Sequence, residues 1–192
     1  MPPKVKITRE DIINATLNLV REQGVDAINA RAIAAALNCS TQPLFSNFES
    51  MEDLQNAVVN TSYERYTEFI KRELENGKYP PYKAYGIAYI RFAREERELF
   101  KLLFMCDRSD ADLSPREDFE QVVSLIMETN GISYDRAMLF HLEMWSAVHG
   151  IATMHATRFL KLEWELISNI ISDIYNGIRI KHLSEENNDG SN

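Results

Sequence analysis

The sequence predicts an all-α fold, because apolar residues recur at helical spacing along almost the whole chain and the alternating pattern of strands is nearly absent. Residues typical of helix caps and turns punctuate this pattern. The chain has 192 residues, of which 45% are hydrophobic, and this is enough for one substantial core or for a small domain joined to a larger one. We therefore expect a protein built from helices that pack on helices.

The first expected helix begins at Thr8 and ends at Gly24. Asp11 stands three residues after Thr8, which is the spacing of a capping box, and glycine commonly follows the last turn of a helix. A second, short helix is expected over residues 30–37, with Asn29 as its N-cap. Both helices belong to the N-terminal quarter of the chain.

A tight turn at Asn38 is expected next, because asparagine tolerates the left-handed conformation that helix ends often need. A third short helix follows, with Ser40 or Thr41 as its cap and Pro43 in its first turn, where proline costs little. Two short helices joined by a tight turn form a helix-turn-helix. Its outward side chains are short and polar, which suits contacts to base edges or phosphates; they are Ser40, Thr41, Gln42, Ser46 and Asn47.

The rest of the chain is also predicted to be helical. The expected helices cover residues 51–76, 82–93 and 96–106, a segment from Ser114 to about Asn130, residues 134–158 and residues 163–183. The C-terminal segment SEENNDGSN is polar and without periodicity. We therefore expect three parts: a helix-turn-helix domain over residues 1–50, a larger helical domain over residues 51–184 and a disordered tail over residues 185–192.

Charge is distributed unevenly along the chain. The net charge of −8 taken alone argues against nucleic-acid binding. The first 50 residues, however, carry five basic and five acidic side chains, so the remaining residues hold all of the negative charge. The basic side chains Lys4, Lys6, Arg9 and Arg31 suit phosphate contacts. The distribution is compatible with a DNA-binding N-terminal domain joined to an acidic body.

Other classes of protein lack support in the sequence. We find no nucleophile–base pair, glycine-rich phosphate loop or metal-ligand pattern, and the spacings of eight and six residues between His141, His149 and His155 do not match a zinc-binding helix. We expect no catalysis, metal or cofactor. The two cysteines are expected to be reduced thiols, and the absence of a secretory signal or an apolar span predicts a cytoplasmic protein without membrane contact.

The segment TREDIINATLNLVREQGVDAINARAIAAALNCSTQPLFSNFESMEDL resembles the DNA-binding domain of TetR-family transcriptional regulators, over about a quarter of the chain. The resemblance implies that Thr41 and Gln42 read bases, while Phe45 and Phe48 make core or van der Waals contacts. The full set of expected DNA-binding residues is Lys4, Lys6, Arg9, Asn29, Arg31, Ser40, Thr41, Gln42, Phe45, Ser46 and Asn47.

Three positions depart from the family pattern. Phe45 stands where the family usually has a phosphate-binding tyrosine, Asn47 where it usually has a histidine, and Met51 where it usually has a lysine. Each hydrogen bond to a charged phosphate is worth roughly 1.5–3 kcal/mol. We therefore expect weaker and less salt-dependent DNA binding than in a typical member, partly offset by the basic side chains of the N-terminal domain.

A second segment, MWSAVHGIATMHATRFL, resembles the tryptophan-histidine-glycine segment in the ligand-binding domain of one TetR subgroup. There this helix lies near the pocket and the dimer interface. The expected pocket residues are Phe100, Phe104, Met105, Trp145 and His149, although a plain helical core has the same composition. The resemblance also implies a four-helix dimer interface formed by the last two helices, with Trp164, Ile167, Ile171 and Ile174 as its expected residues.

The resemblance implies a homodimeric regulator that binds a palindromic operator in double-stranded DNA and is a repressor relieved by a small hydrophobic effector. An activator of the same fold fits the sequence equally well. The main alternative is a helical ligand-binding or interaction protein with weakened or lost DNA binding, which the three departures and the acidic total favour. An intact basic arm and the outward polar face favour the regulator.

Overall fold

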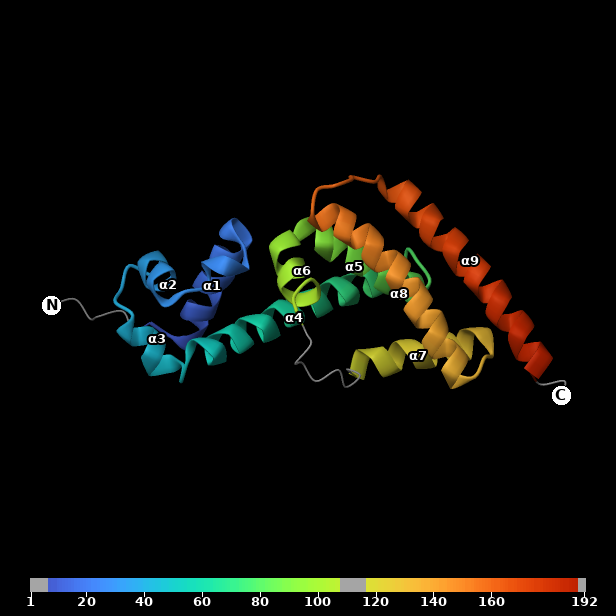
Figure 1. Cartoon of the computed structure of the whole chain (residues 1–192), viewed down its shortest axis with the longest axis horizontal. Coiled ribbons are helices and arrows are strands. Elements are labelled where there is room, and N and C mark those ends of the chain that lie inside the picture. Colours follow the sequence, from blue (N-terminus) through green and yellow to red (C-terminus); the bar gives the residue numbers. More distant parts are fainter. Residues whose placement is uncertain (1–6, 108–116, 190–192) are drawn as a thin grey trace. The chain divides into compact units, whose positions relative to one another are not determined.

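The computed structural model describes the backbone of residues 7–107 and 117–189, and this part of the chain is helical with no strand (Figure 1). The predicted all-α fold is confirmed. The helices are α1 (Arg9–Gln23), α2 (Ala30–Ala36), α3 (Gln42–Asn47), α4 (Met51–Asn76), α5 (Pro81–Glu95), α6 (Arg97–Phe104), α7 (Glu117–Asn130), α8 (Tyr134–Ala156) and α9 (Trp164–Asp189), with a short 3-10 helix at Val25–Ala27. The expected helix start at Ser114 lies outside the described residues.

The described residues group into two compact units. The first comprises the residues up to 68 together with residues 95–106, and the second comprises residues 69–94 together with those from 107 onward. The first unit therefore contains α1, α2, α3, the N-terminal part of α4 and α6. The sequence predicted a boundary at residue 50, whereas the structure places more of α4, and α6, with the N-terminal helices.

The start of α1 follows from its sequence. The Thr8 hydroxyl accepts a hydrogen bond from the backbone N–H of Asp11, and the Asp11 carboxylate accepts one from the backbone N–H of Thr8, which is the predicted capping box. The pKa of the Asp11 carboxyl is lowered by the hydrogen bonds that it accepts from the backbone N–H and the hydroxyl of Thr8. Ile12, Leu17 and Val20 are buried on the inner face of the helix. Gly24 ends α1 with a φ of 85°.

The turn between α2 and α3 depends on Asn38, which has a φ of 50°. The N–H of Asn38 donates to the carbonyl of Ala35 (3.1 Å), and the N–H of Cys39 donates to the carbonyl of Ala34 (2.9 Å). These two bonds form a Schellman motif, which satisfies carbonyls at the end of α2. The prediction that Asn38 makes the turn in a left-handed conformation is confirmed.

This geometry predicts how substitutions at Asn38 affect stability. Asn38→Ala should lower the free energy of unfolding by about 1 kcal/mol, because alanine pays the full steric cost of the left-handed conformation. Asn38→Gly should be neutral or slightly stabilising, because glycine adopts that conformation freely. Urea unfolding of both variants is the measurement. An alanine variant as stable as the glycine variant would contradict the assignment.

Helix α6 joins the first unit through an ion pair with α1. The Arg21 guanidinium donates from Nη2 to Glu96 Oε1 (2.6 Å) and from Nε to Glu96 Oε2 (2.8 Å). This bidentate pair is the main cause of the raised pKa of Arg21. Phe100 and Leu103 of α6 are fully buried. The helix-turn-helix and α6 are therefore parts of one packed unit.

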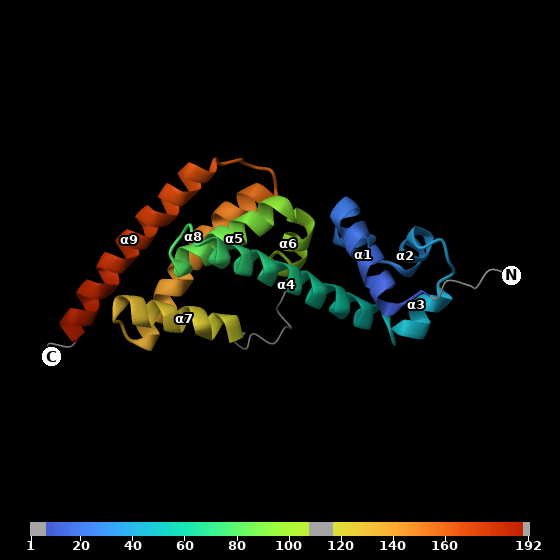
Figure 2. The ribbon, with the colours of Figure 1, turned by 180° about the vertical axis from the view of Figure 1, so that it is seen from behind.

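The core of the second unit forms where α5 and α8 pack side by side in parallel (Figures 1 and 2). A Cβ at Gly86 would lie 3.4 Å from a methyl group of Val148, so the two helices approach closely there. Tyr89, about one turn after Gly86, meets His149, the residue after Val148, at 2.8 Å between the Tyr89 hydroxyl and His149 Nδ1. Phe92 and Phe140 are fully buried in this unit.

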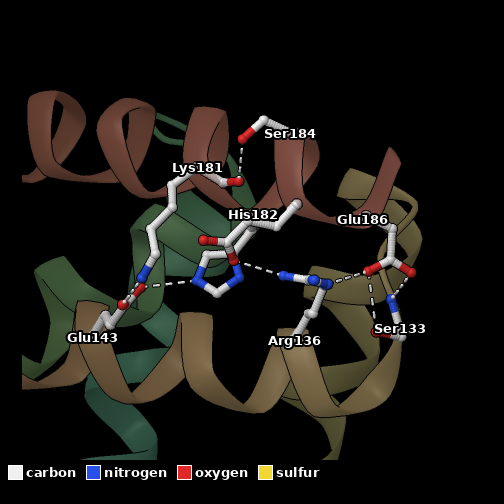
Figure 3. Close-up of polar contacts among 8 residues, drawn as sticks. Ser133, Arg136, Glu143, Lys181, His182, Ser184 and Glu186 are labelled. Atoms are coloured by element: carbon white, nitrogen blue, oxygen red, sulfur yellow. Dashed lines mark hydrogen bonds and ion pairs between the residues drawn. The ribbon is translucent and has the colours of Figure 1, made fainter. Parts of the chain in front are cut away.

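Helix α9 extends beyond its predicted end at residue 183. The expected disordered tail is therefore wrong for residues 185–189, which continue the helix to Asp189. The reason is the pairing of Arg136 on α8 with Glu185 (2.7 Å) and Glu186 (2.8 Å) on α9, shown in part in Figure 3. These partners lie about fifty positions apart, so no local pattern indicates them. Residues 190–192 lie outside the described part.

Candidate nucleic-acid interface

The helix-turn-helix has one buried face and one open face. Asn29 caps α2 by accepting a hydrogen bond from the N–H of Ala32 (2.9 Å), as predicted. Ile33 and Ala34 of α2 are buried, and so are Leu44 in α3 and Phe48 directly after it. This packing fixes α2 and α3 against α1, and it leaves the outer side of α3 to solvent.

Most of the side chains expected to bind DNA lie on the open side. Exposed residues of the set are Arg9, Asn29, Arg31, Ser40, Gln42, Phe45 and Ser46, while Thr41 and Asn47 are half-buried. Phe45 has 54% of its surface exposed and Phe48 only 4%, so Phe48 belongs to the core and Phe45 presents its ring to solvent. Lys4 and Lys6 lie outside the described residues.

Two polar residues of α3 hydrogen-bond to their own helix. The Ser46 hydroxyl donates to the carbonyl of Gln42 (3.0 Å), and Asn47 Nδ2 donates to the carbonyl of Pro43 (2.8 Å). Thr41 makes no side-chain capping bond, so the predicted cap at this position is not formed. The side chain of Gln42 has no hydrogen bond to another described residue. The side-chain polar groups of Thr41 and Gln42 are therefore not engaged within the described part of the chain.

Arg9 has a structural role that the sequence did not predict. Its guanidinium donates to the carbonyl of Asn47 (2.8 Å) and to Asp53 Oδ1 (3.2 Å), and it lies 4.0 Å from the centroid of the Phe48 ring. The hydrogen bond from Arg9 is the main cause of the lowered pKa of Asp53. Arg9 thus joins the start of α1 to the end of α3 and the start of α4, and much of its donor capacity is used within the protein.

The expected pocket residues fall into two groups. Phe100, Phe104 and Met105 belong to the first unit, where Phe100 is fully buried and Met105 is 41% exposed. Trp145 and His149 belong to the second, where their rings stack at 5.0 Å between centroids. Trp145 is 42% exposed, so it is not a core residue.

His149 and His155 make the stability of the protein depend on pH. Burial lowers the pKa of both histidines, and the positive charges of Arg94 and Lys161 lower the pKa of His155 further. Below about pH 6.5 the unfolded chain therefore binds more protons than the folded chain, and stability falls as pH falls. Urea unfolding at pH 7.5 and 5.5 should show this loss. A His149→Phe variant should lose less free energy of unfolding between pH 7.5 and 5.5 than the unchanged protein. If the two proteins lose the same amount, His149 does not contribute to the pH dependence.

The structure also contains an open groove that the sequence did not predict. It lies in the second unit and has a volume of about 560 Å³; its lining residues are Leu74, Pro81, Tyr85, Glu120, Gln121, Ser124, Leu125 and Glu128. None of the expected pocket residues lines it. The one signal in the sequence is Leu74, an apolar residue in the otherwise polar end of α4.

Two of the four expected dimer residues are core residues of their own subunit. Ile167 has no exposed surface and Ile171 has 3%, so neither is open to a partner; Trp164 and Ile174 are half-buried. These two assignments are corrected because the inner face of α9 packs on α8. Large apolar residues are instead exposed elsewhere on the same two helices: Leu139, Leu142 and Trp145 on α8, and Leu166 and Ile180 on α9.

Comparison with protein families decides the class. The family model described as bacterial regulatory proteins, tetR family, matches residues 12–58, and the model described as tetracyclin repressor-like, C-terminal domain, matches residues 82–166. The chain belongs to the TetR family. It is a DNA-binding transcriptional regulator with a C-terminal ligand-binding domain, in a family of regulators that are not enzymes. No curated protein matches the sequence of this TetR-family regulator.

Two further findings concern the described residues of the TetR-family regulator. None of its helices within residues 7–107 and 117–189 is long and apolar enough to cross a membrane. In the same ranges, no group of three or more histidine, cysteine, aspartate or glutamate side chains is arranged to hold a metal ion. The match at residues 12–58 covers α1, α2, α3 and the start of α4, and it therefore includes the helix-turn-helix.

Proposed function

We propose that this regulator is a cytoplasmic homodimer that binds a palindromic operator and acts as a repressor relieved by a small hydrophobic effector. The observation that carries the proposal is the open face of α3, where Thr41 and Gln42 hold unengaged polar groups over a buried support of Leu44 and Phe48. Threonine and glutamine side chains form hydrogen bonds with base edges in the major groove. A dimer would present two such helices to successive turns of DNA.

The exposed apolar residues of α8 and α9 support the homodimer. Leu142 on α8 is 47% exposed, and Ile180 on α9 is 69% exposed. Exposed apolar side chains on neighbouring helices favour association with an identical face, as in a four-helix interface with two-fold symmetry. Association through these residues leaves Ile167 and Ile171 in the core of each subunit.

Substitution in this face tests the dimer. Leu142→Glu should convert the protein to monomers at micromolar concentration, because it places a charge in a desolvated apolar contact. Sedimentation velocity measures the change. Leu74→Glu is the matched control, since Leu74 is also exposed (37%) but lies on α4, and this variant should stay dimeric. A dimeric Leu142→Glu variant would contradict the proposed interface.

Effector release would act by population shift. Helix α4 is continuous from residue 51 to residue 76 and belongs to both units, so it links the reading head to the ligand-binding part. The Arg21–Glu96 pair ties α6 to α1 in the first unit. An effector that favours a different spacing of the two heads would lower operator affinity. The tryptophan-histidine-glycine segment supports placing ligand contacts near Trp145 and His149.

Sedimentation with a selected operator tests the function. A duplex is first enriched from a random pool and then mixed with the protein at increasing ratios. We expect saturation at two chains per duplex and a palindromic sequence. A random-pool selection without enrichment, at low salt, would favour the alternative of a ligand-binding protein without DNA binding. That alternative draws support from Arg9, Ser46 and Asn47, whose polar groups are partly engaged inside the protein.

A further inference from the structure

The C-terminal ends of α5 and α8 bring together charged and aromatic side chains that the proposed function does not use. Arg94 is the next-to-last residue of α5, His155 is the next-to-last residue of α8, and Trp164 is the first residue of α9; all three belong to the second unit. The Arg94 guanidinium lies 5.0 Å from the centroid of the Trp164 ring, and the Arg91 guanidinium lies 4.6 Å from the same ring. Trp164 therefore contacts two cations.

Two nitrogen atoms of this cluster are buried without a hydrogen-bond partner among the described residues. They are Nη1 of Arg94 and Nε2 of His155, and His155 as a whole is only 5% exposed. More than nine in ten buried polar groups in folded proteins have a partner, because an unpaired one costs free energy. Arg94 Nη1 and His155 Nε2 are thus two donors that lack an acceptor, although Oε2 of Glu73, whose other oxygen pairs with Arg91, is also buried without a partner in the described part of the chain.

The cluster also carries an excess of positive charge. Arg91 pairs with the buried carboxylate of Glu73, but no hydrogen bond or ion pair joins Arg94 to a carboxylate of the described residues. Lys161, in the segment that connects α8 to α9, adds a further positive charge that acts on His155. Burial, Arg94 and Lys161 all lower the pKa of His155, so its ring is neutral near pH 7 and Nε2 can carry the proton as a donor.

A carboxylate supplies what the cluster lacks. It has two acceptor oxygens and one negative charge, and arginine binds it through charge-assisted hydrogen bonds. We propose that Arg94 Nη1 and His155 Nε2 donate to the carboxylate of a small organic acid whose apolar part lies against Trp164. Arg94 and Trp164 are both half-exposed, so their outer parts reach the surface, whereas Nη1 of Arg94 and Nε2 of His155 are buried and an acid would have to displace the side chains that cover them. The groove between α4, α5 and α7 does not suit such an acid, because Glu120 and Glu128 line it.

The site is a binding site whether or not the chain binds DNA. Its role as the effector site rests on the proposed function and replaces the placement of ligand contacts near Trp145 and His149; it then narrows the effector class to apolar carboxylic acids. A bound carboxylate would hold the ends of α5 and α8 together through Arg94 and His155. Residue 95 follows Arg94 and belongs to the first unit, so the ligand would act next to the chain segment that leads into α6.

Fluorescence of Trp164 tests the proposal directly. The chain has two tryptophans, so a Trp145→Phe variant leaves Trp164 as the only indole. Titration with benzoate should give a saturable change, and the neutral isostere benzamide should give none. Arg94→Gln in the same background should weaken benzoate binding about tenfold or more, whereas Arg94→Lys should keep part of the affinity. Arg31→Gln is the matched control, because Arg31 is exposed and belongs to the other unit.

Calorimetric titration of the otherwise unchanged chain and of Arg94→Gln gives a second readout, and thermal unfolding confirms that the variant folds. If neither benzoate nor hexanoate gives a saturable response up to about 10 mM, the proposal is wrong. Equal binding by Arg94→Gln, or equal binding of benzamide, would also overturn it. Operator binding is measured separately without acid. If the protein binds benzoate but no operator, the proposed function is wrong and the proposed carboxylate site is still supported.

Discussion

Glu73→Ala is expected to lower the free energy of unfolding by about 3 kcal/mol, which is the largest stability effect we predict for a polar residue. Glu73 is 3% exposed, and its Oε1 accepts a hydrogen bond from Nε of Arg91. Removal of one member of a buried ion pair is costly because the other charge stays desolvated. The Arg91 guanidinium also lies under the ring of Trp164, so its position is fixed by packing.

Glu75 offers a matched control two residues along the same helix. Its side chain is 67% exposed and lies 3.9 Å from Lys71, so Glu75→Ala should change stability by less than about 0.5 kcal/mol. Urea unfolding of both variants measures the contrast. A Glu73→Met, Arg91→Met double variant should lose less than the single Glu73→Ala variant, because it leaves no buried charge. Equal stabilities of the two alanine variants would show that Glu73 is not held as described.

The double variant Thr41→Ala, Gln42→Ala is expected to lose most of its operator specificity. The bidentate base contact that Gln42 can make is worth about 1–3 kcal/mol of discrimination, and a dimer loses it in both reading heads. We therefore expect specific binding to weaken by about 2–6 kcal/mol, while the salt-dependent non-specific component remains. Fluorescence anisotropy with operator and scrambled duplexes measures both terms.

The double variant should fold normally, because neither side chain makes a hydrogen bond that holds α3 in place. Its melting temperature should match that of the parent within a few degrees. Asn60→Ala is the control for DNA binding, since Asn60 is exposed on α4 outside the reading surface. A control variant that loses as much affinity as the double variant would show that Thr41 and Gln42 have no special part in recognition.

The sequence predicts the local features of the fold well. The capping box of Thr8 and Asp11, the cap at Asn29 and the turn at Asn38 each depend on residues within a few positions of one another. Such signals lie entirely within a short segment of sequence, so they do not depend on how the rest of the chain packs. For the same reason the order of the helix-turn-helix and the bounds of α4 were predicted closely.

Features that depend on distant partners were not predicted. Arg21 and Glu96 are 75 positions apart, and their pairing brings α6 into the first unit. The end of α9 depends on Arg136, and the burial of Ile167 and Ile171 depends on which side of α9 meets α8. A broad apolar stripe on a helix indicates that this side of the helix is buried. It does not indicate whether the stripe packs within its own chain or against a second chain.

The reading surface of α3 was likewise predicted only in its local features. Its polar composition was evident from the sequence, but the engagement of Ser46, Asn47 and Arg9 within the protein depends on packing. That engagement removes further donors from DNA and adds to the departures at Phe45, Asn47 and Met51. It strengthens the expectation that this regulator binds DNA more weakly than a typical member and concentrates recognition on Thr41 and Gln42.

Selection from a random pool of duplexes is the most direct test of the central claim, that two copies of α3 read a palindromic operator. The unchanged protein and the Thr41→Ala, Gln42→Ala variant are taken through the same rounds at low salt. We predict that the unchanged protein enriches a palindrome whose half-sites lie about one helical turn apart, and that the variant does not. Enrichment of the same palindrome by the variant, or of none by the unchanged protein, would contradict the account.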